Sequence, residues 1–81
     1  MDLESARARI KKVKEEYESQ LLALPGVVGV GISEITDQWG RPQPCIRIYV
    51  ENLDEETLRP LPKDIEGFPT DIKEVGVPRL L

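Results

Sequence analysis

The spacing of apolar residues predicts a long N-terminal helix over residues 2–24. Pro25 and Gly26 follow and end the helix, because proline lacks an amide donor and glycine permits left-handed dihedrals. The apolar stripe can pack on a sheet of the same chain or form a seam with a second subunit. Its members recur at steps of three and four, the repeat of one helical face, and they are Leu3, Ala6, Ile10, Val13, Tyr17, Leu21 and Leu24.

Two segments with alternating apolar residues predict a β-hairpin. Residues 27–36 form the first strand and residues 45–50 the return strand, with a loop over 36–42 that contains Asp and Gly as turn formers. The alternation places Val and Ile side chains on one face of both strands. These side chains are Val28, Val30, Ile32, Ile46, Ile48 and Val50.

The second half of the chain predicts a short helix and one further strand. We expect Asn52 to cap the helix, with Glu55 three residues on in a capping-box pattern, and Pro60 to help end it. Residues 68–75 form the third strand, in which Pro69 must lie at the start or on an edge. Residues 77–81 form a tail.

The element order α-β-β-α-β predicts an α+β fold in one small domain over residues 1–81. Helix 2–24 precedes a ββαβ core over 25–76. We expect two layers, with a three-stranded, mainly antiparallel sheet and both helices on one face. A right-handed crossover makes the second and third strands parallel. We expect the third strand to lie beside the first, in the order 2-1-3.

The opposite face of the predicted sheet carries the candidate partner contacts. Gly29 and Gly31 alternate within a strand, which indicates close approach of another ring or backbone. The motif GVVGVG does not fit a phosphate loop, because no helix follows it. Arg47 and Tyr49 share this face with the glycines, Ser33 and Cys45. Trp39 at the hairpin tip is a fifth candidate contact, unless its ring folds back over the hairpin.

Composition excludes several kinds of chemistry. The chain has no histidine and one cysteine, so we expect no catalytic residue, no cofactor, no metal ligand and no internal disulfide. We expect Cys45 to be a buried, inert thiol. With 15 acidic against 11 basic residues the net charge is −4, which argues against nucleic-acid binding. No apolar run approaches a membrane span or signal peptide, so the cytoplasm is the predicted location.

Three motifs resemble a known module. They are LPGVVGVGI, PCIRIYVEN, and LP followed by DIEGFPTDIKEVG, which together cover about residues 24–76. The pattern is similar to a bacterial and archaeal module found at the N-terminus of some trypsin-like serine peptidase-family proteins and in small stand-alone proteins of unknown function. In such proteins the catalytic triad lies in a downstream peptidase domain. The resemblance therefore implies an accessory or interaction module and transfers no catalytic residue.

The sequence predicts a non-enzymatic interaction domain. It would act by self-association as a homodimer or by docking onto a protein partner. A first alternative is a peptidase-associated module, propeptide-like or inhibitory, that adds a strand to a protease cleft. A second alternative is a small-ligand binding protein that uses the glycine-lined face.

Overall fold

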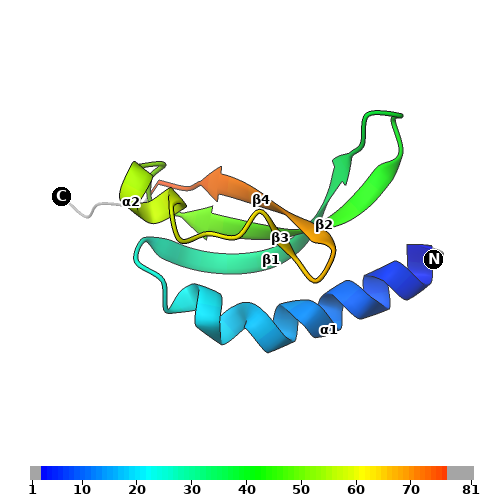
Figure 1. Cartoon of the computed structure of the whole chain (residues 1–81), viewed down its shortest axis with the longest axis horizontal. Helices are drawn as coiled ribbons and strands as arrows, with labels where there is room; N and C mark the ends of the chain where they lie inside the picture. The colour runs from blue at the N-terminus through cyan, green and yellow to red at the C-terminus, as the bar shows by residue number, and fades with distance from the viewer. Residues whose placement is uncertain (1–2, 77–81) are drawn as a thin grey trace.

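A computed structural model of the chain describes residues 3–76. The predicted tail over 77–81 lies outside the described residues. The chain is a small α+β domain with a mixed sheet of four strands. Its elements are α1 (Leu3–Leu22), β1 (Val27–Thr36), β2 (Pro42–Val50), α2 (Glu55–Leu58), β3 (Asp64–Ile65) and β4 (Phe68–Glu74) (Figure 1).

The order of the strands corrects our prediction. The sheet runs β1-β2-β4-β3, with β1 and β2 antiparallel and β2 and β4 parallel. The predicted order 2-1-3 is wrong, because β4 pairs with β2, in the register Ile48↔Ile72. The physical reason is that β2 supplies the centre of the core, where Ile46, Ile48 and Val50 are all 0% exposed, so it lies between two other strands. In β1, by contrast, Val28 and Ile32 are nearly half exposed, as suits a strand at the edge of the sheet.

A fourth strand, β3, was absent from our prediction. Ile65 pairs with Phe68 across a two-residue turn in which Glu66 has φ 48° and Gly67 has φ 87°. Positive φ at both central residues is the signature of the tight hairpin turns that match strand twist. The hairpin is extended by one hydrogen bond from the Thr70 backbone amide to the Lys63 carbonyl, at 3.1 Å.

Helix α1 packs on the sheet of its own chain, which confirms the first of the two alternatives for its apolar stripe. Ile10, Val13 and Leu21 lie in a core with the inward side chains of the strands. In Figure 1, α1 runs along β1. The other core members are Val27, Ile46, Ile48, Val50, Ile65 and Phe68.

Helix α2 differs from our prediction in its position and in its cap. It lies at the end of the sheet beside the turn at Gly26, where Thr57 packs closely, so of the helices within residues 3–76 only α1 covers a sheet face. The helix begins at Glu55, and the capping residue is Asp54, not Asn52. The Thr57 amide donates to the Asp54 carboxylate at 2.8 Å, and this hydrogen bond lowers the pKa of Asp54. Asp54 is the cap because its carboxylate lies three residues before Thr57, the spacing that an N-cap hydrogen bond requires, and Pro60 helps to end the helix after about one turn.

Candidate functional site

Four of the five predicted contact residues meet on one face of the sheet. Gly29 pairs with Tyr49 and Gly31 pairs with Arg47 in the register of β1 and β2. Helix α1 packs against the other face, and within residues 3–76 no element packs over this one. We call it the open sheet face and define it by Gly29, Gly31, Arg47, Tyr49, Asp71 and Lys73.

The Tyr49 ring lies against both glycines. A Cβ atom added to Gly29 would lie 3.4 Å from Cδ2 of Tyr49, and one added to Gly31 would lie 3.5 Å from Cε2. The ring that lies beside the alternating glycines is therefore that of Tyr49, on the neighbouring strand of the same chain. Both distances are those of ordinary van der Waals contact, so the ring packs against the glycines without a close approach that only glycine allows.

Arg47 is held in place by Asp71 on the neighbouring strand. Its Nε and Nη2 atoms lie 2.9 Å and 2.8 Å from the same carboxylate oxygen, Oδ2. The hydrogen bond to Asp71 raises the pKa of Arg47. Sequence reasoning missed this pairing, because Asp71 lies opposite Arg47 only when β4 is parallel to β2 and adjacent to it. The ion pair fixes the guanidinium group of Arg47 on the open sheet face, and the carboxylate of Asp71 balances its positive charge.

Cys45 is a free thiol that is fully buried next to this pair. Burial raises its pKa, and the negative charge of Asp71 adds to the rise. A raised pKa keeps the sulfur protonated at neutral pH, and the thiolate is the reactive form. The burial of Cys45 matches our expectation, and its low reactivity stays a prediction.

Trp39 lies apart from the other four predicted contacts, at the hairpin tip. Asp37 holds the turn, since its Oδ1 atom accepts from the backbone amides of Trp39 and Arg41 at 2.9 Å each. Trp39 is 71% exposed, so the alternative in which its ring folds back over the hairpin is wrong. Figure 1 shows that this loop projects from the body of the molecule.

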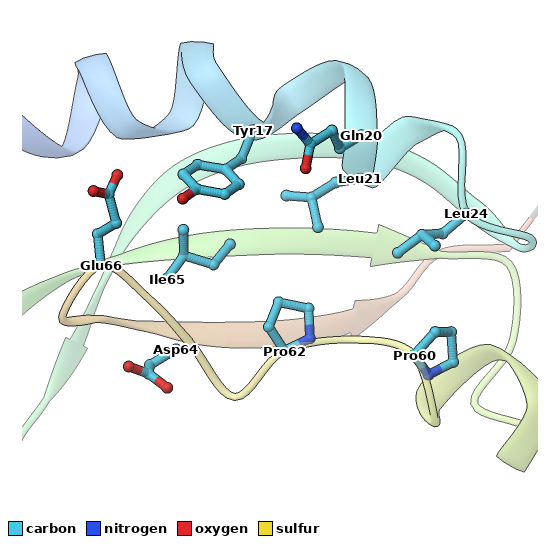
Figure 2. Close-up of a pocket in the computed structure, with 9 residues that line it drawn as sticks. All are labelled: Tyr17, Gln20, Leu21, Leu24, Pro60, Pro62, Asp64, Ile65 and Glu66. Carbon is cyan, nitrogen blue, oxygen red and sulfur yellow. The ribbon is translucent and has the colours of Figure 1, made fainter.

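Sequence reasoning missed a groove between α1 and the segment 60–66 (Figure 2). Its volume is about 400 Å³. Its lining residues are Tyr17, Gln20, Leu21, Leu24, Pro60, Pro62, Asp64, Ile65 and Glu66. Five of the nine come from residues 60–66, a stretch to which we assigned no strand, so the groove could be found only once that segment was placed against α1.

Metal binding and membrane crossing both require features that the described residues lack. Within residues 3–76 no three His, Cys, Asp or Glu side chains are grouped so as to hold a metal ion. No helix in that range combines the length and the apolar character that crossing a bilayer requires.

No protein-family model, curated protein or solved structure matches this chain. The similarity to the peptidase-associated module therefore stays a prediction from the three motifs alone.

Proposed function

We propose that this chain is a non-enzymatic interaction domain that acts by self-association or by docking onto a protein partner. The observation that carries the proposal is the open sheet face, on which Tyr49 and Arg47 are fixed by neighbours and no described element packs. Pre-organised side chains lose little conformational entropy on binding, so more of the interaction free energy remains as affinity.

Trp39 supplies a second contact in this proposal. A tryptophan that is 71% exposed at a loop tip gives a large contact area at a small entropic cost. Burial of its apolar surface contributes about 25 cal/mol per Å², from which the costs of association are subtracted. The cytoplasm is part of the proposal, because a lone, free cysteine fits a reducing compartment.

Site-specific photo-crosslinking tests the proposal. A photoreactive phenylalanine analogue replaces Trp39 at the tip or Lys73 on the open sheet face, in cells that make the protein. Lys73 is exposed and pairs in register with Tyr49, so its replacement leaves the core intact. We expect discrete adducts from both positions. Adduct masses in multiples of the 9.2 kDa chain indicate self-association, and other masses indicate a partner.

The matched control carries the same analogue at Lys12, which is exposed on α1, away from the open sheet face. Adducts from positions 39 and 73, but not from 12, support an interaction domain. The proposal is overturned if neither position gives a discrete adduct, or if position 12 gives the same adducts with the same yield.

A further inference from the structure

Strand β1 forms a long free edge of the sheet. It is the terminal strand of the order β1-β2-β4-β3, so along Val27–Thr36 the backbone groups that point away from β2 have no strand partner within residues 3–76. Two apolar side chains on this strand are also half-exposed, Val28 at 46% and Ile32 at 45%. Unpaired amides and carbonyls in an extended row are complementary to another extended strand.

The contrast with the free part of β4 shows that the β1 edge lacks the usual protection. Beyond β3, the outer edge of β4 is short, begins after Pro69 and carries Asp71, Lys73 and Glu74. Proline and charged side chains are the devices by which proteins prevent edge pairing. From Val28 to Thr36, β1 has no proline, and its single charge, Glu34, is already paired with Arg7 at 3.1 Å.

Helix α1 adds basic charge along this edge. Arg9 contacts the Phe68 ring and the Glu66 carbonyl, so that side of the helix faces β3 and β4. Lys11 lies two residues further on, about 200° around the helix, and therefore on the side of the free β1 edge. A hollow of about 520 Å³ separates α1 from β1 here, lined by Arg7, Lys11, Ile32, Ser33, Glu34 and Pro44. Among the described residues Lys11 forms no ion pair.

We propose that the β1 edge binds an extended segment of a partner protein, which adds to the sheet as a strand and places an acidic side chain against Lys11. This inference rests on the proposed function and names the mode of docking. A second copy of the chain is the weaker candidate for this place, because the one acidic side chain that its β1 could offer to Lys11 is Glu34, which is already paired with Arg7.

Strand addition also defines the pattern of the bound segment. Alternate side chains would point toward α1, where the acidic residue meets Lys11 and apolar residues meet Ile32. The intervening side chains would lie on the side of the open sheet face, beside Gly29 and Gly31. We therefore expect a segment that alternates, with one acidic residue within its apolar set.

Peptide selection followed by backbone methylation tests this mode of binding. A displayed library of random twelve-residue peptides is selected on the complete chain, and a fluorescent synthetic copy of the best peptide is titrated by anisotropy. In an added strand every second amide donates to β1. N-methylation of that alternate set should weaken binding about tenfold or more, because several hydrogen bonds are lost, whereas methylation of the other set changes it less than about threefold.

Two substitutions on α1 provide the matched test of charge. Lys11→Glu should weaken binding of the selected peptide about fivefold or more, because attraction becomes repulsion. Lys12→Glu makes the same change of charge one residue away, on a side that does not line the hollow, and should leave binding within about twofold.

Several results would overturn the inference. They are an absence of enriched peptides, equal effects of the two methylated sets, and equal effects of the two lysine substitutions. The proposed function is judged separately. Adducts from positions 39 and 73 together with equal methylation effects would leave an interaction domain that does not bind by strand addition, whereas loss of the adducts as well would remove both conclusions.

Discussion

Replacement of Gly26 by alanine should destabilise the fold through two separable effects. Gly26 has φ 81°, where a residue with a side chain loses about 1–2 kcal/mol. The added Cβ would also lie 2.8 Å from Oγ1 and 3.0 Å from Cγ2 of Thr57. Thr57 cannot move freely, because it is 6% exposed and its backbone amide donates a hydrogen bond to the Asp54 carboxylate.

The magnitude follows from comparison with a glycine in open space. Gly40 has φ 78°, and a Cβ added there meets nothing within 4 Å, so Gly40→Ala should cost only the conformational share, about 1–2 kcal/mol. Overpacking adds about 1–3 kcal/mol, so Gly26→Ala should cost about 2–5 kcal/mol. A chain of this length has a total stability of roughly 4–12 kcal/mol, so the difference between the variants is measurable.

Urea unfolding followed by far-ultraviolet circular dichroism is the appropriate assay, because the exposed Trp39 reports poorly on the core. Thr57→Ala in the Gly26→Ala background should recover most of the excess loss, since it removes both clashing atoms. Equal losses for the two glycine variants, or no recovery in the double variant, would refute the assigned contact between Gly26 and Thr57.

Three further predictions concern single side chains. Gly31→Ala should change the free energy of unfolding by less than about 0.5 kcal/mol, because its Cβ would meet the Tyr49 ring at an ordinary 3.5 Å; a large loss in urea unfolding would contradict this. The pKa of Asp54 in the folded chain is lowered from its ordinary value of 3.8. The ionised cap therefore contributes its full stabilisation of the fold above about pH 4, and this stabilisation is lost as the pH falls through the folded pKa. The gap in urea midpoint between the chain and Asp54→Ala should therefore narrow toward about pH 2, and a constant gap would count against the cap. Burial raises the pKa of Cys45, so iodoacetamide should alkylate it slowly in the folded chain and quickly in urea, as mass spectrometry would show; rapid labelling of the folded chain would argue otherwise.

The alternation of side chains in the hairpin was predictable, whereas the position of β4 was not. A period of two placed Gly29, Gly31, Arg47 and Tyr49 on one face, and their register bears this out. A right-handed crossover is satisfied whether the last strand lies beside β1 or beside β2. What decides is that β2 and not β1 carries the fully buried side chains at the centre of the core, which is a property of the packed sheet.

Local irregularities explain the other differences. The register shifts between Val27 and Gly29, so Val27 occupies the core position and Val28 becomes exposed, contrary to the simple alternation. Strand β3 has only two residues, too few for a periodic signal, and its turn places Glu66 at positive φ, which a non-glycine residue seldom adopts. The glycine that follows was the one available indication of a tight hairpin.

Residue-level amide hydrogen exchange tests the central claim most directly. The ¹⁵N-labelled chain would be measured alone at low concentration and again with the crosslinked partner, or at high concentration if the adducts are multiples of the chain. The account predicts that protection rises over residues 29–33 and 45–49, around the open sheet face, and also along the β1 edge where the binder is a partner protein. Protection confined to the exposed face of α1, or no change anywhere along the described chain, would contradict it.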